Sequence, residues 1–304
     1  MAKRTITFND GKKIPAVGWG SGSGGFIGSG QRAVDAGVIA LKDGILHIDT
    51  AQIYKTEEET AESIRISGIP REKIWVTTKR EYAVWKIDAT TPELIRESVE
   101  GSIKRLGTIP DLLLIHNPYI PEAGKIGAFW TILEDLVYDG TLKGCSLGFS
   151  NFRTQDVAEV LKVARIKPVA NQVEFHPFLW AQLEPLQKYQ AEHGIVFQSY
   201  GPLTPLLRHP TGGSLKAVVE KIAADRKIDA STVLLLWTVQ KNVVAITTSN
   251  NPERIQKIAD IDGLPDLSEE EIAAIDEAGK KVHFRHYTEH MEADFPAPNL
   301  PSDA

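Results

Sequence analysis

The chain has 304 residues, of which 42% are hydrophobic and 24% charged, as is typical of a globular protein with a sizeable core. The net charge of -6 argues against a surface that binds nucleic acid or an anionic membrane. Cys145 is the single cysteine, which excludes an intramolecular disulfide and fits a reducing compartment. No stretch reaches the roughly 18 apolar residues of a membrane span, and residues 1–8 lack the apolar core of a signal peptide, so we expect a cytoplasmic protein.

The predicted elements alternate between short strands and helices. The chain starts with a hairpin turned by Asn9-Asp10-Gly11, then a strand at 16–19 and a stretch rich in glycine and serine that ends at Gly30. Further strands are predicted at 45–48, 74–78, 112–115, 144–149, 169–174, 195–200 and 243–246. Helices are predicted at 31–42, 57–67, 91–106, 127–138, 154–164, 184–192, 214–225 and 230–240, with two more starting near 251 and 268.

After the hairpin, these segments form eight strand-then-helix units with no linker between them. Eight such units favour an α/β fold of the closed (β/α)8 TIM barrel type, so we expect one domain over residues 1–304. Each of the last seven strands ends in polar or ionisable residues. One polar strand end means little, but seven at the same end of a barrel predict a pocket there, where α/β proteins place their chemistry.

Three consecutive strands end in residues suited to proton transfer. The first ends in Asp49, with Tyr54 five residues later, and the next two end in Lys79 and His116. Tyrosine is a weak acid, with an unperturbed pKa of about 10, and we expect the Lys79 ammonium to lower the pKa of Tyr54 by stabilising the phenolate. Asp49 would keep Lys79 charged, and His116 would donate a hydrogen bond to a substrate oxygen. This set suits reduction of a carbonyl with hydride from a bound nicotinamide.

Each of these four residues also has an ordinary structural interpretation. Taken singly, Asp49 can be a helix cap or a surface acid, Lys79 a solvated charge, His116 a core histidine and Tyr54 a packing residue. Their joint placement at successive strand ends favours the catalytic interpretation.

A Rossmann dinucleotide site is a rival hypothesis. Residues 20–25 match G-x-G-x-x-G, they follow a strand, and Asp49 ends the next strand. However, the next helix does not open at the third glycine, because residues 26–30 intervene, and the chain continues to eight units without a domain break. Both observations favour the barrel.

Near the carboxyl terminus, His283, His286 and His290 stand at helical spacing and suggest a metal site. They lack the accompanying carboxylates of a typical site, so we predict no metal there. We expect this tail to fold over the barrel mouth with its aromatic residues Phe284, Tyr287 and Phe295.

The motifs around the predicted site resemble those of the aldo-keto reductases. They are His47-Ile48-Asp49-Thr50-Ala51-x-x-Tyr54, Val76-Thr77-Thr78-Lys79, Leu114-Ile115-His116-x-Pro118, Gly148-Phe149-Ser150-Asn151, Asn171-Gln172-Val173-Glu174 and His176-Pro177. They fall in family order, and the similarity covers nearly the whole chain. The resemblance implies a barrel with NADPH or NADP+ extended across its carboxyl-end face and Tyr54 as the acid, with Asp49, Lys79 and His116 as its partners.

The resemblance also implies how the cofactor is held. Ser150, Asn151 and Gln172 would hold the nicotinamide carboxamide, Tyr200 would stack on the ring, and Gly201 and Leu203 would add further contacts. The loop that resembles the family's adenosine 2′-phosphate site contributes Thr247, Thr248, Ser249, Asn250 and Arg254. Many members have proline and lysine in place of Thr247 and Thr248. We therefore expect Arg254, which can form two parallel hydrogen bonds to a phosphate, to carry the preference for NADPH over NADH.

The leading hypothesis is NADPH-dependent reduction of small ketones, diketones, aldehydes or ketolactones. Within the family, Thr247-Thr248-Ser249 and residues 174–178 are most similar to fungal conjugated-polyketone (ketopantoyl-lactone) reductases. Trp85, Asn117 and Tyr119 are predicted to line the substrate pocket.

Two rival hypotheses are a non-catalytic NADP(H)-binding regulator, as in the similar potassium-channel β-subunits, and a structural, crystallin-like barrel. Neither role requires the intact set of four residues. We expect a small-molecule carbonyl as partner, no nucleic acid or membrane, and a monomer or weak homodimer.

Overall fold

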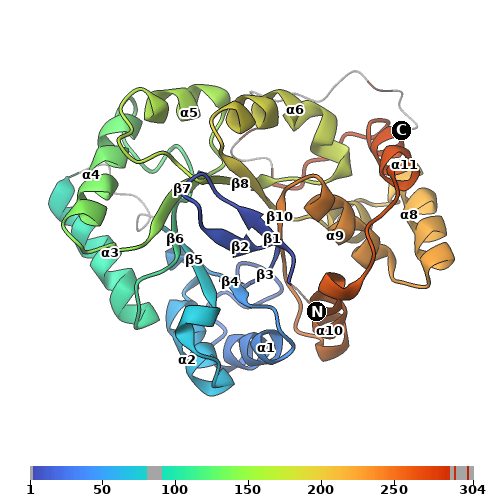
Figure 1. Ribbon diagram of the computed structural model, residues 1–304, viewed down its shortest axis with the longest axis horizontal. Helices are drawn as coiled ribbons and strands as arrows, with labels where there is room; N and C mark the ends of the chain where they lie inside the picture. Colours follow the sequence, from blue (N-terminus) through green and yellow to red (C-terminus); the bar gives the residue numbers. More distant parts are fainter. Residues whose placement is uncertain (1–2, 81–90, 288–290, 292–299, 301–304) are drawn as a thin grey trace.

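The computed structural model describes residues 3–80, 91–287, 291 and 300. Parallel strands close into a barrel in the order β10-β3-β4-β5-β6-β7-β8-β9, and helices surround it (Figure 1). This confirms the predicted (β/α)8 barrel. The barrel strands are β3 (Val17–Gly20), β4 (His47–Asp49), β5 (Trp75–Arg80), β6 (Leu112–Ile115), β7 (Ser146–Ser150), β8 (Ala170–Glu174), β9 (Val196–Tyr200) and β10 (Val244–Thr247).

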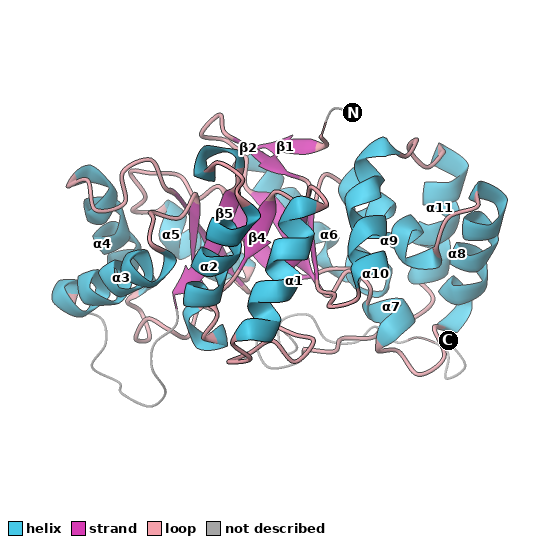
Figure 2. Cartoon of the chain, turned by 90° about the horizontal axis from the view of Figure 1, so that it is seen from below, coloured by secondary structure: helices cyan, strands magenta, loops and turns pink. Residues whose placement is uncertain are grey.

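The predicted hairpin is present as β1 (Thr5–Thr7) and β2 (Lys13–Pro15), an antiparallel pair outside the barrel. It lies across one end of the barrel (Figures 1 and 2). The side chains of Ile6, Phe8 and Ile14 are buried in a cluster with inward residues of the barrel strands, including Leu112. The hairpin therefore closes the amino-terminal end, and the carboxyl-terminal strand ends face the opposite side.

The helices largely match the predicted ones. They are α1 (Gln31–Lys42), α2 (Glu57–Ser67), α3 (Pro92–Leu106), α4 (Ile126–Tyr138), α5 (Thr154–Leu161), α6 (Pro177–Glu192), α7 (Thr204–Leu207), α8 (Gly213–Arg226), α9 (Ala230–Gln240), α10 (Pro252–Ala259) and α11 (Glu269–Gly279), with 3-10 turns η1 (Gln52–Tyr54), η2 (Arg71–Lys73) and η3 (Asp260–Gly263).

Local sequence explains where several helices begin and end. In α3, the Thr91 hydroxyl accepts a hydrogen bond from the Leu94 amide at 3.3 Å, and Gly107 closes the helix in the left-handed region. α6 starts at Pro177, seven residues before the predicted start, because a first-turn proline needs no hydrogen-bond acceptor and the helix tolerates Pro185 in its interior. α7 was not predicted, since four residues carry no periodic signal.

The core fills the space between strands and helices. The four residues of β6 are all apolar and buried, as expected of a strand covered on both faces.

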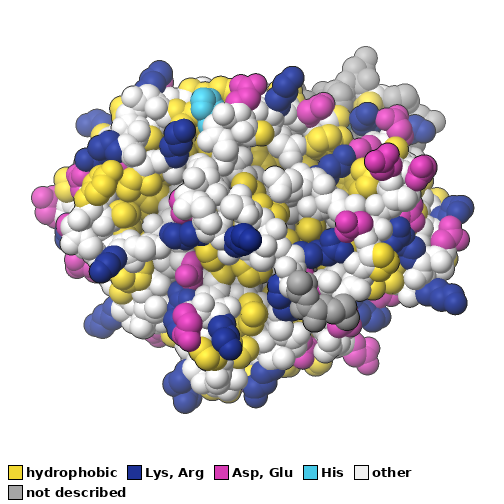
Figure 3. Space-filling view, in the orientation of Figure 1, with side chains coloured by type: hydrophobic (Ala, Val, Ile, Leu, Met, Phe, Trp, Pro, Cys, Tyr) yellow, Lys and Arg dark blue, Asp and Glu magenta, His cyan; other side chains and the backbone are white. Residues whose placement is uncertain are grey.

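On the hairpin face of the molecule, basic and acidic side chains are interspersed (Figure 3). Within the described part of the chain, none of the helices combines the length and apolar character that crossing a membrane requires.

Candidate active site

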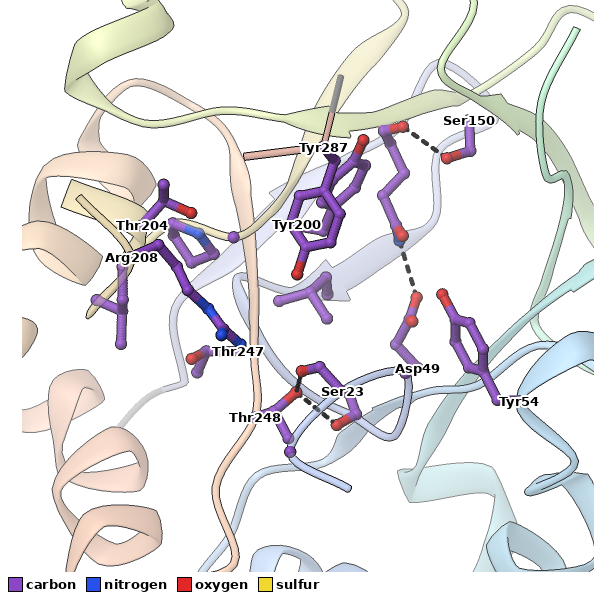
Figure 4. A pocket seen from close by; sticks show the side chains of 18 of the residues that line it. Ser23, Asp49, Tyr54, Ser150, Tyr200, Thr204, Arg208, Thr247, Thr248 and Tyr287 are labelled. Carbon is purple, nitrogen blue, oxygen red and sulfur yellow. Dashed lines mark hydrogen bonds between the residues drawn. The ribbon is translucent and has the colours of Figure 1, made fainter. Parts of the chain in front are cut away.

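A cavity of about 330 Å³ opens among the carboxyl-terminal strand ends (Figure 4). Its walls come from the strand ends, from the glycine-rich stretch after β3, from the segment around α7 and from the carboxyl-terminal tail. The lining residues are Gly20, Gly22, Ser23, Gly24, Asp49, Tyr54, His116, Ser150, Asn151, Gln172, Tyr200, Gly201, Pro202, Leu203, Thr204, Leu207, Arg208, Ile246, Thr247, Thr248 and Tyr287. The polar strand ends thus do form a pocket.

A buried ion pair lies at the base of this cavity. The Lys79 ammonium donates a hydrogen bond to Asp49 Oδ1 at 2.5 Å and another to the Thr50 carbonyl at 3.1 Å. The Lys79 side chain is fully buried, and that of Asp49 is 4% exposed. Lys79 does not line the cavity, so it can act on a bound molecule only through its neighbours. One neighbour is Tyr54, whose ring centre lies 5.0 Å from the ammonium nitrogen.

Tyr54 and His116 meet at the cavity wall. The Tyr54 hydroxyl oxygen is 3.5 Å from His116 Nε2, and the two rings are nearly perpendicular. Tyr54 ends the η1 turn after β4, and Gln52 in that turn is anchored to Ser98 on α3 by hydrogen bonds. A Cβ on Gly22 would lie 2.5 Å from the Tyr54 ring and 2.9 Å from its hydroxyl oxygen, so only glycine fits against this tyrosine.

Amide and hydroxyl groups line the opposite wall. Gln172 donates to Asp49 Oδ2 at 2.8 Å, and the Ser150 hydroxyl donates to the Gln172 carbonyl at 2.7 Å. Asn151 adopts a left-handed backbone conformation, and its side-chain oxygen accepts from the Tyr200 hydroxyl at 2.7 Å. Burial raises the pKa of Tyr200 far above its ordinary value, so this hydroxyl keeps its proton. The structure therefore brings these four predicted cofactor residues together.

The predicted phosphate loop is only partly in the cavity. Thr247 and Thr248 line it, and the Thr248 hydroxyl donates to the Gly20 carbonyl at 2.8 Å. The other members of the loop, Ser249, Asn250 and Arg254, lie outside the lining. The Arg254 amide is bonded to the Asn251 side chain, which caps α10, and its side chain is exposed to solvent.

Of the predicted substrate residues that the structure describes, Asn117 and Tyr119 are not among the residues that line the cavity. Asn117 is buried and accepts a hydrogen bond from the Tyr119 amide at 3.0 Å, while Tyr119 is 57% exposed and its ring faces the Arg153 guanidinium. Trp85 lies outside the described residues. Their assignment to the substrate pocket stays a prediction.

The predicted tail reaches the cavity through Tyr287. His290 and Phe295 lie outside the described residues. Among the described ones, no three side chains of histidine, cysteine, aspartate or glutamate are grouped as metal ligands would be.

Several cavity residues were not predicted from the sequence, and Arg208 is the charged one among them. Arg208 follows α7, and its side chain extends into the cavity toward Thr247 (Figure 4). Arg208 does not stand at a strand end, so the pattern that identified the other residues gave no signal for it. Tyr287 was expected in the tail over the barrel mouth, but its contact with Tyr200 was not foreseen.

Comparison with known proteins identifies the family of the chain. The family model described as "Aldo/keto reductase family" matches residues 19–280. The chain belongs to the aldo/keto reductase family. The protein is therefore an enzyme, an oxidoreductase that acts on carbonyl groups.

The relatives of this aldo-keto reductase include fungal enzymes. The NAD/NADP-dependent indole-3-acetaldehyde reductase of Schizosaccharomyces pombe is 32% identical over 290 residues, covering 93% of this chain and 98% of the relative. The NADPH-dependent alpha-keto amide reductase of Saccharomyces cerevisiae is 32% identical over 296 residues, covering 90% of each chain. Among solved structures, an aldo/keto reductase from Brucella melitensis is 34% identical with a TM-score of 0.77, covering 91% of this chain and 100% of that one.

Proposed function

We propose that the protein is an NADPH-dependent carbonyl reductase in which Tyr54 protonates the carbonyl oxygen. The observation that supports this most is the arrangement at one cavity wall. The Tyr54 hydroxyl is 3.5 Å from His116 Nε2, and its ring lies 5.0 Å from the buried Lys79 ammonium. A proton donor (Tyr54), a hydrogen-bond donor (His116) and a buried cation (Lys79) therefore lie close together.

Each residue has a separate task in this proposal. Tyr54 gives its proton to the oxygen as the carbonyl carbon is reduced. His116 binds the same oxygen and fixes the orientation of the carbonyl. The Lys79 ammonium stabilises the phenolate that remains, and Asp49 holds that ammonium in place.

The cavity wall also suits the cofactor, which supplies the hydride when bound. Ser150, Asn151 and Gln172 present hydroxyl and amide groups, which match the donors and acceptors of a carboxamide. Tyr200 offers a flat ring whose hydroxyl is held by Asn151. Arg208 brings a cation to the wall near Thr247 and suits the charge of the diphosphate.

The proposed substrates are small aldehydes and ketones, above all ketones with a second carbonyl group next to the reacting one. The relatives named above reduce an aldehyde and alpha-keto amides, and the resemblance to ketopantoyl-lactone reductases adds diketones and ketolactones. An adjacent carbonyl withdraws electrons and makes the reacting carbon a better hydride acceptor. This chemistry, common to alpha-keto amides, diketones and ketolactones, is the basis of the finer assignment.

The test follows NADPH consumption at the absorbance band of the reduced nicotinamide. The panel contains a linear diketone, a ketolactone, an alpha-keto amide, an aromatic aldehyde and a simple ketone. We expect the dicarbonyl compounds to have the highest kcat/KM, and the simple ketone the lowest. NADPH binding without oxidation by any member of the panel would instead favour the non-catalytic regulator.

A further inference from the structure

A buried charged cluster lies at the end of β8, next to the cavity but outside the residues assigned above. Its centre is Glu174, whose side chain is fully buried. Glu174 Oε1 accepts a hydrogen bond from the His286 amide at 2.9 Å, and Oε2 accepts one from the Tyr287 amide at 3.0 Å. These donors follow Glu174 by 112 and 113 residues, so one carboxylate joins a barrel strand to the carboxyl-terminal segment.

Two further side chains complete the cluster. His176 Nε2 lies 3.2 Å from Glu174 Oε1, and the Arg285 guanidinium lies 3.9 Å from Oε2, with 3% of its side chain exposed. Burial raises the pKa of Glu174, but the hydrogen bonds from His176 and the two backbone amides outweigh this effect and hold the pKa below its ordinary value. The carboxylate is therefore charged at neutral pH, and both of its oxygens bind the segment.

The segment held in this way carries a cavity wall. The Tyr287 ring lines the cavity and packs edge-on against Tyr200, with ring centres 5.2 Å apart. Figure 4 shows the two rings together on the side of the cavity that faces Asp49 and Tyr54. Three residues earlier, Phe284 packs edge-on against His209, which adds a second attachment.

We propose that Glu174 is a positioning residue: by binding the His286 and Tyr287 amides, it fixes the Tyr287 ring as the wall that limits the size of the carbonyl substrate. The part that concerns substrate size rests on the proposed reductase function. The part that concerns the hydrogen bonds does not. Because the buried carboxylate already holds these amides in the free protein, little further ordering of the segment is needed when a substrate binds. The cavity wall is therefore in place before the substrate arrives.

The hydrogen bonds are tested first, without any turnover. In Glu174→Gln, one oxygen becomes an amide donor that faces a backbone N–H group, so one of the two bonds is lost. Hydrogen exchange of the peptide that contains residues 284–287 should be at least tenfold faster in this variant than in the wild type. Exchange in α3, far from the cluster, should be unchanged and serves as the control. Equal exchange of the 284–287 peptide in both proteins would overturn the proposal.

The effect on selectivity is tested with a small diketone and a bulky aromatic diketone. Tyr287→Ala should raise the ratio of kcat/KM for the bulky over the small substrate by roughly tenfold, mainly through KM, because it removes the wall. Tyr287→Phe keeps the ring and should leave the ratio unchanged. Glu174→Gln should shift the ratio in the same direction as Tyr287→Ala.

The double variant distinguishes positioning from a general loss of structure. If Glu174 acts through Tyr287, adding Glu174→Gln to Tyr287→Ala should change the ratio by less than twofold. Independent effects that multiply would contradict the proposal. If the wild type reduces neither diketone, the proposed preference for dicarbonyl substrates fails, whereas the exchange experiment still decides whether the Glu174 hydrogen bonds hold the segment.

Discussion

The Asp49–Lys79 pair offers a sharp test of how the site is built. Asp49 Oδ1 accepts from the Lys79 ammonium at 2.5 Å, and Oδ2 accepts from Gln172 at 2.8 Å, so both oxygens serve donors. In Asp49→Asn, one oxygen becomes an NH2 group. Either orientation of the new amide then places a donor against Lys79 or against Gln172, and the opposite charge is lost.

The magnitude follows from burial. The Lys79 side chain is fully buried and that of Asp49 is 4% exposed, so solvent screens the pair weakly. Removing one partner of such a pair typically costs about 3–5 kcal/mol, since the remaining charge stays buried. We expect Asp49→Asn to lower the free energy of unfolding by about this amount. Adding Lys79→Met removes the second charge and should restore stability to within about 2 kcal/mol of the wild type.

Urea unfolding followed by tryptophan fluorescence measures these differences. The control is Glu159→Gln, which breaks a surface pair with Lys162 whose side chains are 56% and 65% exposed. That change should cost less than about 1 kcal/mol. Turnover should be lost in the double variant, which has no cation to stabilise the Tyr54 phenolate, and lowered in Asp49→Asn, in which Asp49 no longer holds the Lys79 ammonium in place. A cost for Asp49→Asn as small as that of the control would refute the reasoning.

Three further predictions concern single residues. His116→Ala should lower turnover while most of the NADPH affinity remains, as titration by fluorescence quenching would show; normal turnover with lost NADPH affinity contradicts this role. Arg254→Ala should weaken NADPH binding roughly tenfold, about 1.4 kcal/mol, and leave NADH binding nearly unchanged. The control Lys257→Ala, on the same helix, should affect the binding of neither cofactor. Equal weakening of NADPH and NADH binding in Arg254→Ala would refute the assignment. Burial lowers the pKa of His47 to about 4, so the unfolded chain binds a proton that the folded chain does not between about pH 6.5 and 4. As the pH falls from 6.5 to 4, the free energy of unfolding should therefore decrease by about 3 kcal/mol more in the wild type than in His47→Gln. Urea unfolding at the two pH values measures this decrease, and the same decrease in both proteins would contradict the prediction.

The sequence was sufficient for the barrel because each unit carries its own signals. Short buried strands alternate with helices whose start and stop residues are explicit, as in α3 with Thr91 and Gly107. Residues at strand ends could be assigned to one pocket because a closed parallel barrel brings all the carboxyl ends to the same side. Asp49, Tyr54 and His116 were found in this way, and their catalytic roles remain predictions.

The direction in which a side chain points and the contacts between residues far apart in sequence could not be predicted. Arg208 points into the cavity because of how the segment after α7 turns, and no local pattern encodes that turn. The contacts of Glu174 could not be predicted, since nothing near it in sequence indicates an amide donor 112 residues away. The glycine-rich stretch suggested a nucleotide motif, yet at Gly22 the absence of a side chain makes room for Tyr54.

The central claim is that Tyr54 supplies the proton, and Tyr54→Phe tests it most directly. The change removes one oxygen and leaves the ring next to Gly22 and Lys79. We predict an NADPH dissociation constant within twofold of the wild type and turnover lower by about 10²-fold or more. Tyr287→Phe, which removes the hydroxyl of another cavity tyrosine, should keep normal turnover. Near wild-type turnover in Tyr54→Phe would contradict the account, because the proton would then come from another group.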